Sequence, residues 1–142
     1  FGSNCSVWFN TVIRGDVNVI RIGDKVNIQD GAVIHCTYQK HPTIIGNNVS
    51  IGHNAIVHGC VILDNVLIWM GPIVMDNCVI ESNSIVAAGA VVTQNTVVGA
   101  GTIWAGVPAK KVKDIDQSSF AGEIERISNN YVMYSSWFKE EA

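Results

Sequence analysis

A six-residue period of aliphatic residues runs through most of the chain and limits what it can fold into. The lead positions are Phe1, Val7, Ile13, Ile22, Ile28, Ile34, Ile45, Ile51, Val57, Leu63, Trp69, Met75, Glu81, Ala87 and Thr93. A second small or apolar residue recurs four places after most leads, as at Val26, Ala32, Val49 and Ala55. Two inward positions in each repeat predict a short strand followed by a turn.

Strands this short cannot form a stable sheet within one repeat, so each must pair with its counterpart one coil away. Three hexapeptides make a triangular coil of 18 residues, and stacked coils place equivalent residues ~4.8 Å apart. The pattern therefore predicts an all-β solenoid. A β-sandwich would instead show strands of varied length with turns about every 8–12 residues, which the constant period argues against.

The period is interrupted twice and then stops. Nine residues separate Ile13 from Ile22, and eleven separate Ile34 from Ile45, which predicts two protruding loops of the kind that often carry function. After Trp104, glycine and proline end the strand series. Apolar residues at three- and four-residue steps then predict an amphipathic helix over 119–139.

These boundaries suggest one domain. Residues 1–108 form the β-helix, and residues 109–142 form a linker and a helix that packs on its side. Because the sequence opens at Phe1, already inside a repeat, we expect further N-terminal coils to precede it.

Charge, apolar runs and cysteine spacing limit the kinds of partner and the location that we expect for this chain. The net charge is −3 and the 9 Lys and Arg residues are mostly scattered, so we expect no nucleic-acid surface. No apolar run approaches the ~18 residues of a membrane span, so we expect no membrane partner. The four cysteines form no CxxC pair, which predicts reduced thiols and a cytoplasmic location.

Two histidines occupy equivalent places in adjacent coils. His35 follows Ile34 and His58 follows Val57, and their separation of 23 residues equals one coil of 18 plus a five-residue insertion. Their backbones should lie ~4.8 Å apart on one face, a spacing at which two imidazoles can bind one ion.

A third histidine lies on a different face of the same coil. His53 comes two places after Ile51, so its side chain should diverge from the first two. A zinc site needs three or four protein ligands, so we expect His53 of a neighbouring subunit to complete it, in a C3 homotrimer. Fe²⁺ or Co²⁺ also suits imidazole ligands. The alternative is a stack of polar residues on a solvated face.

The neighbouring residues are weaker candidates for the site. His41, in the loop, fits no stack and is expected at the surface. Cys36 adjoins His35, but adjacent residues of a strand point in opposite directions, so we do not expect it to be a ligand.

Several segments together resemble the γ-class carbonic anhydrase family. They are Ser6–Asn10, Val12–Asp16, Asn27–Asp30, Ile34–His35 and Gly52–Cys60. The resemblance covers nearly the whole chain. It implies a left-handed parallel β-helix, a homotrimer, and zinc at each interface bound by His35 and His58 of one subunit and His53 of the next.

The resemblance also implies roles for other residues. Gln29 would hydrogen-bond the metal-bound water, and Arg14, Asp16 and Asp30 would form intersubunit ion pairs, with a purely structural role as the alternative. Tyr131 is similar to a tyrosine that reaches the metal pocket in some relatives, or it is a packing residue. The sequence departs from the family prototype because residues 36–44 contain no Asp or Glu, where the prototype carries a proton-shuttling glutamate.

The expected activity is the reversible hydration of CO₂ to bicarbonate by a zinc-bound hydroxide, a carbonic anhydrase-like lyase reaction. Without the acidic shuttle, proton transfer would fall to buffer, water or a nearby His or Tyr. Two alternatives stay open. One is a hexapeptide-repeat acyl- or acetyltransferase, which shares the Gly106–Ala109 exit, and the other is a non-catalytic metal-binding trimer.

Overall fold

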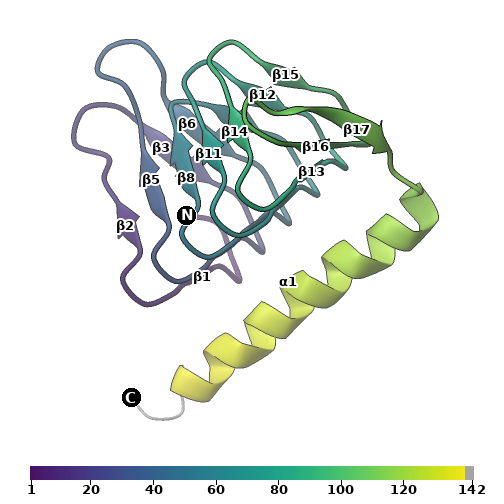
Figure 1. Ribbon diagram of the computed structural model, residues 1–142. Coiled ribbons are helices and arrows are strands. Elements are labelled where there is room, and N and C mark those ends of the chain that lie inside the picture. The colour runs from purple at the N-terminus through teal and green to yellow at the C-terminus, as the bar shows by residue number, and fades with distance from the viewer. Residues whose placement is uncertain (140–142) are drawn as a thin grey trace.

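The computed structural model, described here for residues 1–139, is a triangular solenoid of short strands with one helix beside it (Figure 1). The strands form three sheets, and all neighbours within them are parallel except the last pair. The prediction of a parallel β-solenoid built from hexapeptide repeats and followed by a C-terminal α-helix is therefore confirmed.

Each sheet forms one face of the prism. The first contains β1 (Ser6–Val7), β4 (Asn27–Ile28), β7 (Ser50–Ile51), β10 (Leu67–Ile68), β13 (Ile85–Val86), β16 (Thr102–Ala105) and β17 (Lys110–Asp114). The second contains β2 (Val12–Ile13), β5 (Val33–His35), β8 (Ile56–His58), β11 (Ile73–Val74) and β14 (Val91–Val92). The third contains β3 (Ile20–Ile22), β6 (Thr43–Ile45), β9 (Val61–Ile62), β12 (Val79–Ile80) and β15 (Val97–Val98).

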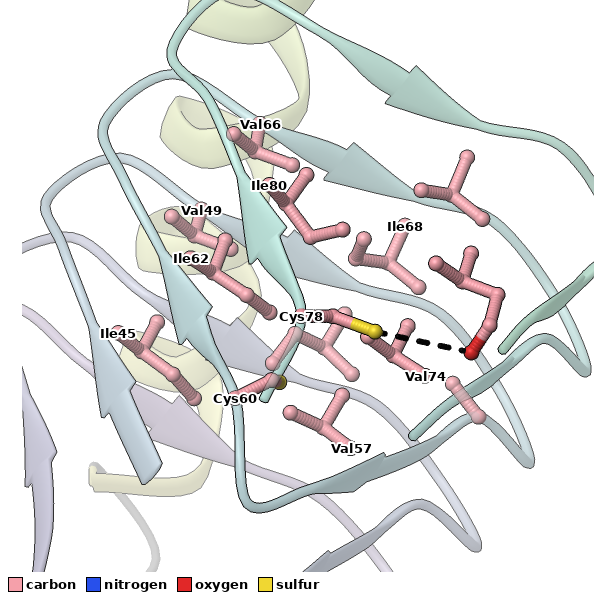
Figure 2. Close-up of a cluster of buried hydrophobic side chains, with 14 of the residues drawn as sticks. Ile45, Val49, Val57, Cys60, Ile62, Val66, Ile68, Val74, Cys78 and Ile80 are labelled. Atoms are coloured by element: carbon pink, nitrogen blue, oxygen red, sulfur yellow. Dashed lines mark hydrogen bonds between the residues drawn. The ribbon is translucent and has the colours of Figure 1, made fainter. Parts of the chain in front are cut away.

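The pattern of burial shows that the six-residue frame predicted from the sequence is wrong after Val57. The predicted lead Leu63 is 39% exposed, whereas Ile62 is fully buried. Ile45 pairs with Ile62, so this coil is 17 residues long (62 − 45) rather than 18. The lead positions predicted from Leu63 onward are wrong by one residue. The true inward series is Ile62, Ile68, Val74, Ile80, Val86, Val92 and Val98, part of which Figure 2 shows.

The missing residue falls at the corner formed by His58, Gly59 and Cys60. Gly59 has a φ of +59°, a conformation that glycine adopts without the penalty a Cβ brings. The sequence did not reveal this shortened corner because Ile62 and Leu63 are both aliphatic, as are several later neighbours. Further along the chain the sequence does carry a signal, because Glu81 and Thr93 are polar whereas Ile80 and Val92 are aliphatic.

The C-terminal segment holds an additional strand. The linker predicted after residue 108 contains β17, which pairs antiparallel with β16. Helix α1 (Gln117–Lys139) then begins two residues earlier than predicted. Asp116 caps it, since its Oδ1 accepts a hydrogen bond of 3.1 Å from the backbone N–H of Ser118.

Helix α1 runs alongside the first sheet (Figure 1). Phe120 and Ile124 are buried against Leu67 of β10, which fixes the helix on this face and brings its later residues near the corner after β4. No helix within residues 1–139 is both long enough and apolar enough to cross a membrane.

The corrected frame predicts unequal effects for two adjacent aliphatic residues. We expect Ile62→Ala to lower the free energy of unfolding by about 2–5 kcal/mol, because it leaves a cavity in the packed core. Leu63→Ala should cost several-fold less, because Leu63 already contacts solvent. Urea unfolding of both variants measures the difference, and a larger loss for Leu63→Ala would support the uninterrupted six-residue frame.

Candidate metal centre

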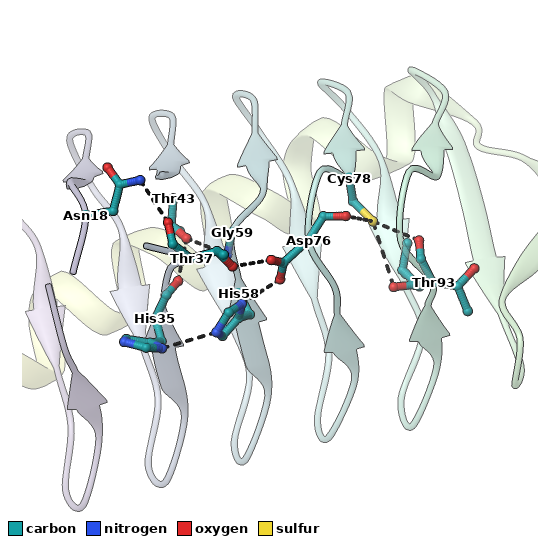
Figure 3. A network of polar contacts seen from close by, with 10 residues as sticks. Asn18, His35, Thr37, Thr43, His58, Gly59, Asp76, Cys78 and Thr93 are labelled. Atoms are coloured by element: carbon teal, nitrogen blue, oxygen red, sulfur yellow. Dashed lines mark hydrogen bonds and ion pairs between the residues drawn. The ribbon is translucent and has the colours of Figure 1, made fainter. Parts of the chain in front are cut away.

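His35 and His58 lie directly opposite each other on β5 and β8. Their rings meet with His35 Nδ1 3.1 Å from His58 Nε2, and Figure 3 shows both side chains on the same face of adjacent coils. The five-residue insertion between β5 and β6 is what brings residues 23 positions apart into register. This is the arrangement that the repeat arithmetic predicted.

In each imidazole, the outer ring nitrogen, which points away from the other ring, lies near a carboxylate. Asp16 Oδ1 lies 3.3 Å from His35 Nε2, and Asp76 Oδ1 lies 2.6 Å from His58 Nδ1. When these outer nitrogens donate to the carboxylates, the inner nitrogens both present lone pairs.

Two lone pairs facing each other at 3.1 Å repel unless one ring donates a proton or a metal ion lies between them. The nitrogen ligands of one tetrahedral zinc ion are about 3.3 Å apart, given Zn–N distances of ~2.0–2.1 Å. Both the spacing and the chemistry of the pair therefore fit a divalent metal.

His53 lies away from this pair. It follows β7, its Nδ1 is 3.3 Å from Asp30 Oδ1, and its side chain is 43% exposed. Across residues 1–139 of a single chain, no three His, Cys, Asp or Glu side chains gather as a metal-binding group. One chain thus presents the His35–His58 pair on the second sheet. His53 is separate and follows β7 of the first sheet.

Three of the predicted site residues share a hollow of about 290 Å³. Gln29, His53 and Tyr131 line it together with apolar side chains, between α1 and the first sheet. Gln29 is buried, and its Nε2 donates to Asn27 Oδ1 at 2.9 Å. The structure therefore groups Gln29, His53 and Tyr131, and separates them from His35 and His58.

Tyr131 is held by aromatic packing. Its ring contacts Trp8 edge to face, with centroids 5.5 Å apart. Burial, with a further contribution from the negative charge of Asp30, raises the pKa of the Tyr131 hydroxyl above its ordinary value. The hydroxyl therefore stays protonated at neutral pH and can donate a hydrogen bond.

The predicted ion-pair residues make contacts within one chain. Arg14 Nη1 lies 2.8 Å from Asp16 Oδ2, and the hydrogen bond from Arg14 lowers the pKa of the Asp16 carboxyl. Asp30 faces His53 of the same chain. Any additional role of Arg14, Asp16 or Asp30 across a subunit interface stays a prediction.

One residue beside the histidine pair was missed by sequence reasoning. Asp76 follows His58 by 18 residues. Because Val57 pairs with Val74, Asp76 lies one residue beyond the position in register with His58, and counting in whole coils of the corrected length does not reach it. Burial alone raises the pKa of Asp76, but hydrogen bonds from Thr37 and His58 outweigh that effect and the pKa is lowered. His41 is partly exposed, which is compatible with the expected surface position, and its backbone pairs with that of Thr37.

The cysteine beside the pair is a neutral thiol. Cys36 is buried, and burial raises the pKa of its thiol. A metal ligand has to be the thiolate, which burial disfavours; the expectation that Cys36 is not a ligand stays a prediction.

The sequence and the fold were compared with those of known proteins. No family model matches the sequence. The chain is 54% identical over 133 residues to a probable carbonic anhydrase of Methanocaldococcus jannaschii, across 94% of this chain and 80% of that protein. It is 44% identical over 138 residues to a carbonic anhydrase of Geobacillus kaustophilus, across 97% of this chain and 75% of that protein.

A plant relative and two crystal structures extend the comparison. Identity to the mitochondrial gamma carbonic anhydrase 1 of Arabidopsis thaliana is 41% over 140 residues, across 95% of this chain and 50% of that protein. A hexapeptide transferase family protein from Anaplasma phagocytophilum is 39% identical with a TM-score of 0.89, across 96% of this chain and 80% of that one. A putative acetyltransferase from Bacillus cereus is 37% identical with a TM-score of 0.94, across 99% and 81%.

The solenoid and its structural neighbours make this a hexapeptide-repeat protein. Within that class, the identity to the carbonic anhydrases, sustained over most of both chains, assigns it more narrowly. The chain belongs to the γ-carbonic anhydrase family.

The raised pKa of Tyr131 generates a spectroscopic prediction. Alkaline titration followed by absorbance near 295 nm should show a tyrosine component that ionises above the ordinary value of 10.0. Tyr131→Phe should remove that component, whereas Tyr38→Phe, at an exposed position, should leave it in place. Circular dichroism at each pH checks that the fold persists, and a late component that survives Tyr131→Phe would contradict the assignment.

Proposed function

We propose that this protein catalyses the reversible hydration of CO₂ to bicarbonate at a zinc site shared between subunits of a homotrimer. The observation that carries the proposal is the inward-facing His35–His58 nitrogen pair, 3.1 Å apart and backed by two carboxylates. It occurs in a member of the γ-carbonic anhydrase family, where relatives named carbonic anhydrase are 44% and 54% identical to this chain.

The proposed ligand set is His35 and His58 of one subunit and His53 of the adjacent subunit. A bound zinc ion would supply the Lewis acidity that makes water a nucleophile near neutral pH. Fe²⁺ or Co²⁺ would suit the same imidazoles. The exposed position of His53 supports its part in a shared site, because its ring is accessible to a neighbouring chain.

Gln29 is the proposed orienting group for the attacking water. Its amide is fixed by Asn27, whose own amide donates to Ser50 Oγ at 2.8 Å. This relay restricts the rotation of the Gln29 side chain, so little reorganisation is needed when the reaction occurs.

Tyr131 is the proposed donor on the opposite wall of the hollow. Its protonated hydroxyl can hydrogen-bond an oxygen of the substrate or product. The apolar side chains around it, Trp69 and Ile127 among them, suit an uncharged substrate such as CO₂.

For proton release, this chain lacks the proton-shuttling glutamate of the family prototype. The segment between β5 and β6 carries no carboxylate, so we propose that buffer, water or a nearby His or Tyr accepts the proton. A cytoplasmic location is also proposed, resting on the free state of Cys5, Cys36, Cys60 and Cys78.

The second candidate is an acyl- or acetyltransferase. It is favoured by the likeness to proteins described as a hexapeptide transferase and a putative acetyltransferase. Such an enzyme uses one histidine as a general base. A single base does not require a second imidazole and two carboxylates beside it, so the His35–His58 pair favours the metal site. Calorimetric binding of acetyl-CoA by metal-free protein would favour this candidate, whereas bound zinc without turnover would favour a non-catalytic metal-binding trimer.

The shared site predicts a joint loss of metal and activity. Wild-type protein should contain one zinc per subunit by elemental analysis, and should accelerate CO₂ hydration in stopped-flow measurements. His53→Ala should remove most of the metal and reduce the rate to that of buffer, because two imidazoles alone hold zinc weakly. His41→Ala is the matched control and should retain metal. Wild-type protein that binds zinc yet matches the uncatalysed rate would refute the enzymatic proposal.

Gln29 should affect turnover without affecting metal content. We expect Gln29→Ala to lower kcat on the order of 10²-fold, the effect of removing one preorganised hydrogen-bonding group from an active site. Zinc content should stay at the wild-type level, because Gln29 is not a proposed ligand. Loss of zinc in this variant would mean that Gln29 supports the fold of the site instead.

A further inference from the structure

A carboxylate from the next coil contacts Nδ1, the outer ring nitrogen of His58. Asp76 follows β11, and its Oδ1 lies 2.6 Å from His58 Nδ1. Its other oxygen, Oδ2, accepts a hydrogen bond from the hydroxyl of Thr37 (Figure 3). Both carboxylate oxygens are therefore engaged, one by the histidine and one by the segment that follows β5.

Backbone contacts hold Asp76 in place. The carbonyl of Asp76 accepts from the N–H of Asn95 at 3.2 Å, and the N–H of the following residue, Asn77, donates to Gly59 at 2.8 Å. The Asp76 side chain is 22% exposed. A carboxylate fixed in this way can impose an orientation on the ring it contacts.

The inserted loop holds Thr37 by its backbone. The N–H of Thr37 donates to the carbonyl of His41 at 3.0 Å, and the carbonyl of Thr37 accepts from the Asn18 side chain at 3.0 Å. The two loops that interrupt the repeat thus meet at Thr37, beside the carboxylate.

Gly59 leaves the space that this arrangement needs. A Cβ at Gly59 would lie 3.0 Å from the Asp76 carboxyl carbon and 3.1 Å from His41 Cβ. The shortened corner of the solenoid therefore brings Asp76 and the loop close to His58.

We propose that Asp76, itself held by Thr37, is a positioning residue for His58. By accepting from Nδ1–H it fixes the tautomer that leaves the Nε2 lone pair directed at His35. The inference rests on the proposed metal function and deepens it. It assigns the loop after β5 a role in orienting a ligand.

The tautomer can be observed without any metal. Long-range ¹H–¹⁵N correlation of the imidazoles in metal-free protein, assigned with His58→Ala, should show Nδ1 of His58 protonated and Nε2 unprotonated. Asp76→Ala should shift His58 towards a mixture of tautomers, because it removes the acceptor. Asp76→Asn keeps an acceptor oxygen and should restore the Nδ1–H form, which a merely structural role for Asp76 does not predict.

Zinc affinity, measured by chelator competition, provides the second readout. Asp76→Ala should weaken zinc binding about 10–100-fold, the usual effect of losing such a partner. Asp76→Asn should fall between this variant and wild type, and Thr37→Val should lose less than Asp76→Ala. The matched control is Asp64→Ala, at a corner where the carboxylate accepts only from backbone away from the histidines.

The outcomes separate the two proposals. A wild-type His58 protonated on Nε2, or an Asp76→Ala variant with unchanged tautomer, overturns the positioning role. An equal loss of affinity in Asp64→Ala overturns it as well, because the effect would then be general. If wild-type protein binds no zinc, the proposed function fails, while the tautomer measurement still decides whether Asp76 positions His58.

Discussion

The backbone hydrogen-bond ladder between successive coils is the constraint on which the rest of this molecule depends. Each strand contains only two to five residues, too few to be stable without neighbours, so each strand of the coils needs its partner one coil away, and β17 pairs with β16. The ladder then places side chains at equivalent positions of the repeat ~4.8 Å apart. In the core this stacks aliphatic residues, and on the outer face of the second sheet it stacks His35 on His58.

Stacking of this kind has a chemical consequence at polar positions. Aliphatic ladders gain from burial, but two imidazoles held 3.1 Å apart need a proton or a metal ion between their nitrogens. The carboxylates of Asp16 and Asp76 occupy the outer nitrogens, which leaves the inner pair for a cation. The rigid solenoid thus preorganises two of the three proposed zinc ligands before any ion arrives.

The interruptions of the repeat are as important as the repeat itself. A five-residue insertion brings His35 and His58 into register, and a one-residue shortening at Gly59 brings Asp76 and the inserted loop close to His58. Hexapeptide-repeat proteins share the scaffold, and likeness of fold alone does not separate a carbonic anhydrase from an acetyltransferase. The side chains placed by these interruptions carry the functional argument.

Much of this protein could be predicted from its sequence. The six-residue period determined the solenoid, the spacing of His35 and His58 determined that they meet, and the apolar steps after residue 119 determined a terminal helix. These features follow from local periodicity, which a single sequence records directly.

Other features were decided by tertiary structure alone. The corner at which one coil shortens to 17 residues was decided by packing, because Ile62 and Leu63 are both aliphatic and the core accepts only Ile62. The polar residues Glu81 and Thr93 in the uncorrected frame signal the shift but not its place. The grouping of Gln29, His53 and Tyr131 depends on how α1 docks against the first sheet. Asp76 lies one residue beyond the position in register with His58, so their contact depends on the conformation of the turn after β11. Contacts between elements are set by packing and by the register of the ladder, and neither can be read from the repeat.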